Sequence, residues 1–181
     1  MSRPVTLVGA RCAGKTTAGR GLAGALGVEF ADLDELLVRL ALDDLPALSA
    51  RGAGDLLVDL GEAAYRDLEA RALRLALNRV PPLGVLATGG GAVLDSGSRR
   101  LLGQASTCIW LRCSPRLLAE RMLADPQARP SLTGAPAHEE IEAVLAQREA
   151  LYAAVAQQVL DVDRLSEHEV VVGLAKLLQG P

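Results

Sequence analysis

Aromatic side chains, long apolar runs and excess charge are scarce in this 181-residue sequence. It contains only four aromatic residues: one Trp, one Phe and two Tyr. With a net charge of −3, it has neither the basic surface nor the stacking platform that nucleic-acid-binding domains use. No apolar run approaches the roughly 20 residues that a membrane-spanning helix needs. We therefore expect neither nucleic acid nor a membrane as a partner.

Cysteine and lysine are also scarce. The three cysteines (Cys12, Cys108 and Cys113) form no CxxC pair and cannot all form disulfides. The N-terminal residues lack the regions of a signal peptide, and together these features favour a reducing cytoplasm. Of 19 basic residues only Lys15 and Lys176 are lysine. A lysine in a chain that otherwise uses arginine indicates a position where a compact charge is needed.

The sequence is rich in apolar residues: half of it is hydrophobic, mostly Ala, Leu and Val. Short apolar runs alternate with segments of helical periodicity, which predicts an α/β fold with a mainly parallel sheet covered on both faces. We expect a single domain over residues 1–181. The expected strands span 5–8, 28–31, 85–87, 107–111 and 159–162. The expected helices span 15–26, 36–42, 62–78, 98–102, 115–123, 139–157 and 168–178, with short helices and loops in 43–60.

Residues 9–16 carry a specific motif, because GARCAGKT satisfies G-x4-G-K-[ST] between a predicted strand and a predicted helix. Small residues there let backbone N–H groups surround a phosphate, aided by the helix N-terminus. Lys15 reaches the β- and γ-phosphates, Thr16 offers its hydroxyl to Mg²⁺, and Thr17 contacts a phosphate oxygen. The sequence therefore predicts a P-loop for ATP and Mg²⁺, with ATP bound by Gly9, Ala13, Gly14, Lys15, Thr16 and Thr17.

A P-loop alone does not separate kinases from GTPases or motor proteins. The chain contains no NKxD string for guanine recognition. It is also too short for the additional strands of most ATP-driven machines. A small kinase is therefore the favoured interpretation.

Acidic residues and glycines follow two other predicted strands. Asp32 and Asp34 lie at the end of the second strand, so both can project from the carboxyl edge of the sheet, where α/β proteins bind ligands. Gly89, Gly90 and Gly91 follow the third strand and leave backbone polar groups open to a ligand. Without other evidence, the alternative interpretation is that the acids are solvated residues capping the next helix and that the glycines form a turn. Beside a P-loop, both groups are predicted to be functional, with the glycines as a platform for the substrate and the γ-phosphate.

Further motifs resemble the shikimate kinase family in order and spacing over nearly the whole chain. They are GARCAGKTT (9–17), DLD (32–34), GEAAYR (61–66), ATGGGAV (87–93), RPSL (129–132) and REALY (148–152). The resemblance implies a nucleoside-monophosphate-kinase-like fold with a five-stranded parallel sheet, a substrate-binding region at about 33–62 and a lid at about 125–137. The implied reaction transfers the ATP γ-phosphoryl group to the 3-hydroxyl of shikimate, toward chorismate and the aromatic amino acids.

The resemblance also implies roles for individual residues on the acceptor side. Asp32 helps Thr16 to hold Mg²⁺, and Asp34 accepts a hydrogen bond from the attacking hydroxyl. Arg66 and Arg148 bind the substrate carboxylate through their guanidinium groups. Without the resemblance, an arginine in a helix as rich in acids as 61–72 is usually a solvated surface residue.

Two more arginines are assigned to the nucleotide side. Residues 125–137 are rich in Pro and Gly and lack periodicity, which is typical of a functional loop. Within this predicted lid, Arg129 stabilises charge on the transferred group together with Lys15. Arg121, near the end of the preceding helix, flanks the adenine.

Three departures from the family pattern keep other functions open. Cys12 stands where the family usually has Gly, and a positive φ there would cost about 1 kcal/mol. Ser131 stands where Leu is common, and the segment from Asp34 to Arg66 is longer than expected. One alternative is a related small-metabolite kinase for another hydroxy acid. The other is a nucleotide-binding protein of this kind without kinase activity. We expect a monomer in each case.

Overall fold

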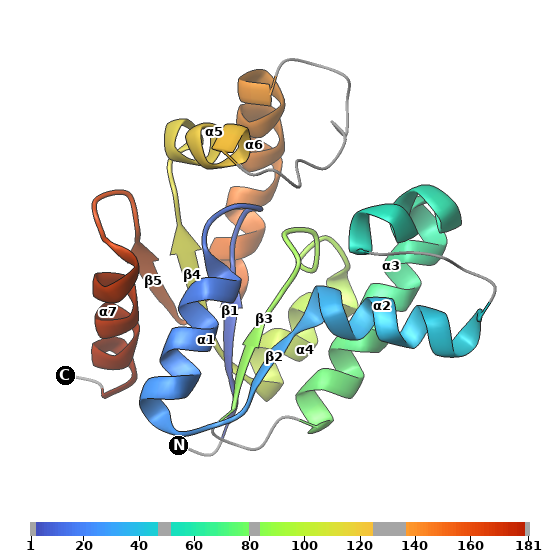
Figure 1. The fold of residues 1–181 in the computed structure, drawn as a ribbon, viewed down its shortest axis with the longest axis horizontal. Coiled ribbons are helices and arrows are strands. Elements are labelled where there is room, and N and C mark those ends of the chain that lie inside the picture. Colours follow the sequence, from blue (N-terminus) through green and yellow to red (C-terminus); the bar gives the residue numbers. More distant parts are fainter. Residues whose placement is uncertain (1–2, 47–51, 80–83, 125–136, 180–181) are drawn as a thin grey trace.

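The computed structural model describes residues 3–46, 52–79, 84–124 and 137–179, drawn as coloured ribbon in Figure 1. Within these residues, one five-stranded sheet forms the centre of the molecule, with every strand pair parallel. Its order is β2-β3-β1-β4-β5. The strands are β1 (Val5–Val8), β2 (Phe30–Asp32), β3 (Val85–Ala87), β4 (Thr107–Arg112) and β5 (Gln158–Asp161). The predicted parallel five-stranded sheet is confirmed.

Helices cover both faces of this sheet. α1 and α7 pack together on one face, whereas α4 and α6 lie on the other (Figure 1). α2 packs against α3 beside the β2 edge, and α5 packs against α6 beyond the end of β4. The described helices are α1 (Lys15–Leu26), α2 (Leu33–Asp44), α3 (Ala53–Arg79), α4 (Ser96–Ala105), α5 (Pro115–Ala124), α6 (Ala137–Val155) and α7 (Glu167–Gln179).

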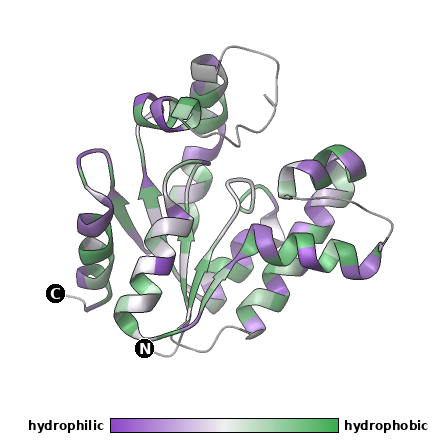
Figure 2. Ribbon diagram, in the orientation of Figure 1, coloured by the Kyte–Doolittle hydropathy of each residue, from purple (hydrophilic) through white to green (hydrophobic). Residues whose placement is uncertain are grey.

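The core follows from the apolar strands. Every residue of β1 and β3 is buried, as are the four inner residues of β4. Figure 2 shows hydrophobic colour along these strands, and mixed hydrophobic and hydrophilic bands along the helices. Strands buried on both sides need helices on both sides, which explains the three-layer arrangement. Among the described residues, no helix combines the length and apolar character needed to cross a membrane.

Helix ends explain where two predicted boundaries were wrong. Gly27 closes α1 in the left-handed conformation (φ 66°), and the N–H of Val28 bonds to the Ala23 carbonyl at 3.0 Å. Because Val28 completes this cap, β2 begins at Phe30 rather than at residue 28. Likewise, Asp95 caps α4 through Ser98 N (2.6 Å), so that helix starts at residue 96 rather than 98.

The region between Asp34 and Arg66 is more helical than predicted. α2 continues to Asp44, and α3 begins at Ala53. Gly61 interrupts α3 with φ 75° and ψ 165°, which divides it into a short first part and a longer second part. Residues 47–51 of the predicted substrate-binding region lie outside the described residues.

The strand order brings the functional segments to one edge of the sheet. β1 lies between β3 and β4, with Leu7 opposite Ala87, and β3 also pairs Ala87 with Asp32 of β2. Thr88 then bonds to the Leu7 carbonyl through both its N–H (3.1 Å) and its hydroxyl (3.0 Å). The segments that follow β1, β2 and β3 therefore begin side by side, at the position where open α/β sheets bind ligands.

Candidate active site

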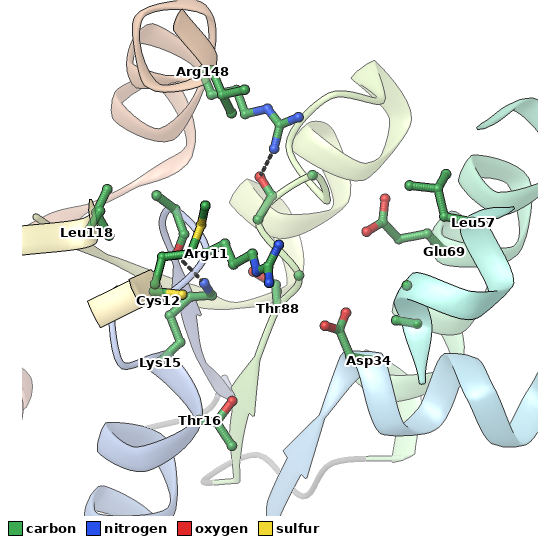
Figure 3. A pocket seen from close by; sticks show the side chains of 18 of the residues that line it. Arg11, Cys12, Lys15, Thr16, Asp34, Leu57, Glu69, Thr88, Leu118 and Arg148 are labelled. Atoms are coloured by element: carbon green, nitrogen blue, oxygen red, sulfur yellow. Dashed lines mark hydrogen bonds between the residues drawn. The ribbon is translucent and has the colours of Figure 1, made fainter. Parts of the chain in front are cut away.

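A cavity of about 690 Å³ opens at this edge of the sheet (Figure 3). Its walls come from the P-loop, the starts of α1 and α2, both parts of α3, the glycine loop 89–91, α5 and α6. Sequence reasoning selected eleven of its lining residues: Gly14, Lys15, Thr16, Thr17, Asp32, Asp34, Arg66, Gly89, Gly90, Gly91 and Arg148. Elements far apart in sequence thus place these side chains in one pocket.

The P-loop is wound by three left-handed residues. Gly9, Cys12 and Gly14 have φ values of 145°, 62° and 89°. Lys15 opens α1 and is buried, and its Nζ donates hydrogen bonds to the carbonyls of Gly9 (2.9 Å) and Ala10 (2.7 Å). The ammonium group is therefore held over the concave side of the loop, where a phosphate-binding lysine is needed.

Asp32 links the P-loop helix to α2. Its Oδ2 accepts a hydrogen bond from Thr16 Oγ1 at 2.7 Å, and its Oδ1 accepts from Asp34 N at 2.9 Å. Asp32 is therefore the N-cap of α2, as the alternative interpretation proposed, but it is only partly exposed and also binds Thr16. The cap fixes Asp34 in the first turn of α2, facing the cavity (Figure 3).

The paired oxygens of Thr16 and Asp32 fit a magnesium ion. A hydroxyl and a carboxylate are the hard donors that Mg²⁺ prefers, and this ion usually completes its shell with water and substrate phosphates. Among the described residues, no group of three or more His, Cys, Asp or Glu side chains could hold a metal by itself. The donor set thus suits a cation that arrives with a nucleotide.

Arg66 enters the cavity from α3 with a buried acidic partner. Its Nη1 lies 2.8 Å from Glu69 Oε2, one helical turn away, and its Nε lies 3.9 Å from Glu62 Oε1. The Arg66 side chain is 22% exposed, so it is not the solvated helix-surface residue of the alternative interpretation. A Cβ on Gly91 would lie 2.3 Å from Arg66 Nη1, which shows how closely the glycine loop packs on this guanidinium.

Glu69 is the acid that sequence reasoning missed. Its side chain is almost fully buried, and this burial raises the pKa of its carboxyl, opposed by the charge of Arg66 and reinforced by that of Asp34. A Cβ on Gly89 would meet both Asp34 Oδ1 (2.8 Å) and Glu69 Oε1 (3.1 Å). Both carboxylates therefore lie against the same side of Gly89.

Glu69 could have been found from the pattern of α3. Tyr65, Glu69, Leu73 and Leu77 recur every four residues and are all buried. A charged residue in an otherwise apolar helical stripe indicates a buried polar partner. The neighbouring acids Glu62 and Asp67 concealed this signal.

Gly90, the middle glycine of the loop, contacts α6. The Gly90 carbonyl accepts hydrogen bonds from Tyr152 Oη (2.6 Å) and Arg148 Nη1 (3.3 Å). The Tyr152 ring packs against Trp110 with 5.8 Å between ring centroids, which locks the tyrosine in the core. Arg148 is thereby directed toward the glycine loop, as Figure 3 shows.

Three predicted nucleotide-side residues do not line the cavity, and a fourth falls outside the described residues. Gly9 and Ala13 belong to the buried frame of the P-loop. Arg121 of α5 lies against the loop, donating from Nη1 to the Cys12 carbonyl at 3.2 Å. Arg129 and the predicted lid, up to residue 136, lie outside the described residues. The role of each of these residues stays a prediction.

Comparisons with known proteins show which family this chain and its fold resemble. A family model described as shikimate kinase matches residues 11–179. A protein named shikimate kinase 2 from Yersinia enterocolitica is 41% identical over 98% of this chain and 97% of its own length. One of the same name from Dickeya chrysanthemi is 42% identical over 89% of this chain and 88% of its own. Among solved structures, a shikimate kinase from Acinetobacter baumannii in complex with shikimate has a TM-score of 0.84 at 29% identity, covering 98% and 93% of the two chains.

Proposed function

The chain belongs to the shikimate kinase family, and from this membership we propose that it transfers the γ-phosphoryl group of ATP to the 3-hydroxyl of shikimate. Members of this family are ATP-dependent kinases, so the predicted family and enzyme class are confirmed. The site residues and their roles are our own assignments.

The observation that carries the proposal is that one cavity contains a phosphate-binding ammonium group, a carboxylate and two guanidinium groups. The P-loop ammonium of Lys15 lies at one side, and the carboxylate of Asp34 lies across from it (Figure 3). Arg66 and Arg148 supply two guanidinium groups farther along the same cavity. A neutral polyol would not need two such groups, whereas a carboxylate matches them.

We assign the transfer step to these residues as follows. Asp34 orients the acceptor hydroxyl and accepts its proton as the hydroxyl oxygen bonds to the γ-phosphorus. The bond from that phosphorus to the bridging oxygen breaks, and ADP leaves. Lys15 exchanges its contacts with the loop carbonyls for the β- and γ-phosphates and stabilises their charge. Thr16 and Asp32 would hold Mg²⁺, which would supply positive charge to the phosphate oxygens.

The glycine loop and two further arginines also have roles in this proposal. Gly90 and Gly91 form the backbone platform under the acceptor, with Gly89 lying against the acids. Arg121 and Arg129 serve the nucleotide, the latter from the lid. We also infer a monomeric enzyme located in the cytoplasm. The free thiols of Cys12, Cys108 and Cys113 support the cytoplasmic location.

The proposal is tested by ADP release in the presence of ATP, Mg²⁺ and shikimate. We expect release that depends on shikimate and that gluconate does not elicit. Release without any acceptor, or with gluconate instead, would contradict the proposed substrate. No release under any condition, together with intact ADP binding, would favour the nucleotide-binding alternative.

Asp34→Asn tests the assigned role of the carboxylate. We expect turnover to fall by about 10²- to 10⁴-fold, because general base catalysis contributes that much, while ADP affinity changes little. Asp43→Asn, an exposed acid on the same helix, is the matched control and should keep normal turnover. Asp34→Asn with wild-type turnover would remove Asp34 from the mechanism.

A further inference from the structure

The side chain of Arg11 has no place in the assignments above. It is the third residue of the P-loop, and it lines the cavity. In Figure 3 its guanidinium group extends from the loop toward Thr88, into the space between Lys15 and Asp34. Its Nη2 is buried and has no hydrogen-bond partner. A buried guanidinium nitrogen without a partner is costly, so it indicates a missing anionic ligand.

Arg11 lies where the two halves of the cavity meet. A Cβ on Gly90 would lie 3.1 Å from Arg11 N and 3.6 Å from the Gly9 carbonyl oxygen. The P-loop backbone at Arg11 is therefore in direct contact with the glycine loop. Lys15 of the P-loop lies on one side of this junction and Asp34 on the other (Figure 3).

The other cations of the cavity are held by partners. Lys15 Nζ binds two loop carbonyls, Arg66 Nη1 binds Glu69, and Arg148 Nη1 binds the Gly90 carbonyl. Arg66 and Arg148 each have a buried Nε without a hydrogen-bond partner, but their terminal nitrogens are held. Among the described cations of the cavity, Arg11 is the one whose unpartnered buried atom is a terminal nitrogen, and it lies at the junction. The group that crosses this junction during the reaction is the phosphoryl group. Its anionic oxygens can accept the hydrogen bond for which Arg11 Nη2 has no partner.

We propose that Arg11 is a catalytic residue that binds the oxygens of the phosphoryl group during its transfer. The inference rests on the proposed function. As the acceptor oxygen bonds to the γ-phosphorus and the bond to ADP breaks, the hydroxyl proton passes to Asp34. The charge on the three equatorial oxygens then lies between Lys15 and Arg11. An arginine fixed on the P-loop itself would supply this contact before any lid closes.

Arg11→Met tests the proposal, since it keeps length and removes the charge. We expect kcat to fall by about 10²- to 10³-fold, as for the loss of one transition-state donor. The KM values for ATP and shikimate should change by less than about threefold, because the contact forms mainly in the transition state. Arg11→Lys should recover part of kcat, since it restores charge without the planar fork.

A transition-state mimic separates a catalytic role from a structural one. We expect wild-type protein with shikimate to bind ADP, Mg²⁺ and aluminium fluoride as a tight complex, and Arg11→Met to lose that tightness while keeping its affinity for ADP alone. Guanidine hydrochloride at millimolar concentration should partly restore turnover to Arg11→Ala. Arg20→Met is the matched control, because Arg20 pairs with Glu35 on the exposed side of α1.

Three results would overturn the inference. Unchanged kcat in folded Arg11→Met would remove Arg11 from the transfer step. A raised KM for shikimate at constant kcat would place Arg11 on the acceptor instead. Lack of acceptor-dependent turnover in the wild-type protein would overturn the proposed function, and the inference with it. The wild-type measurement thus distinguishes the two failures.

Discussion

Cys12 is the residue at which this P-loop differs most from an unstrained one. Its φ of 62° meets the condition under which the sequence analysis expected a cost, and it is the only described non-glycine residue with positive φ. Its carbonyl accepts the hydrogen bond from Arg121, so this backbone conformation also connects the loop to α5. A residue with a Cβ in the left-handed region costs roughly 1–2 kcal/mol, so the P-loop is strained at Cys12.

Cys12→Gly should therefore stabilise the protein. We expect the free energy of unfolding to rise by up to about 1 kcal/mol, because the removed strain exceeds the added freedom of the unfolded chain. Thermal unfolding, with ADP affinity measured in parallel, checks this. Cys12→Ala is the control that keeps the Cβ and loses only the thiol. If both variants melt at the same temperature, the strain does not come from the Cβ.

At the scale of elements, the glycine loop 89–91 lies between three parts of the fold: α2, α3 and the P-loop. Gly89 lies against Asp34 of α2 and Glu69 of α3, Gly90 touches the P-loop, and Gly91 lies against Arg66 of α3. Each glycine is thus required by a different neighbour. The loop acts as a thin spacer that lets the acceptor residues approach the phosphate cradle.

Gly91→Ala should disturb acceptor binding selectively. The added Cβ would lie within 2.3 Å of Arg66 Nη1, so the guanidinium group must move away from its position. Because precise placement of such groups controls binding and orientation, we expect KM for shikimate to rise at least about tenfold. The ADP affinity should stay unchanged, since the nucleotide side is untouched.

Gly103→Ala is the matched control for this substitution. Gly103 lies within α4, and nothing approaches the position of its Cβ within 4 Å. This variant should show normal steady-state kinetics and equal or slightly higher stability. Equal KM values for shikimate in the two variants would show that Arg66 does not bind the acceptor from its observed position.

The ends of strands were easier to predict than the faces of helices. Asp32, Asp34 and the glycine loop could be grouped from sequence, because parallel strands in register end at one edge. Arg66 and Arg148 came from the family resemblance alone, since helix packing decides which side of a helix faces the cavity. Glu69 and Arg11 were missed for the same reason: their importance depends on burial that spacing does not reveal.

At the scale of the whole molecule, the alternation of apolar runs and helical periods was sufficient to predict the layered fold. It could not predict which ionisable side chains are buried or how burial changes their pKa values. Burial raises the pKa of Cys108 to about 12, of Cys113 to about 11 and of Tyr152 to about 12. Each of these groups keeps its proton in the folded chain at a pH where the unfolded chain has released it.

Alkaline pH should therefore destabilise the whole fold. Unfolded cysteines titrate near pH 9.0, so from there the unfolded state binds fewer protons than the native state and the free energy of unfolding falls as pH rises. The slope is about 1.4 kcal/mol per pH unit for each such group, up to pH 11 for Cys113 and 12 for Cys108.

Urea unfolding under reducing conditions between pH 8 and 11 measures this slope. Replacing Cys108 and Cys113 together by Ala should lower stability by a constant amount, because small cavities form in the core, and should also make the alkaline slope shallower by nearly 3 kcal/mol per pH unit, roughly twice the value for one proton. Since the offset is independent of pH, the two effects separate cleanly. A double variant with the wild-type slope would mean that the thiols do not titrate on unfolding, and that Tyr152 and the charged surface govern the alkaline limit.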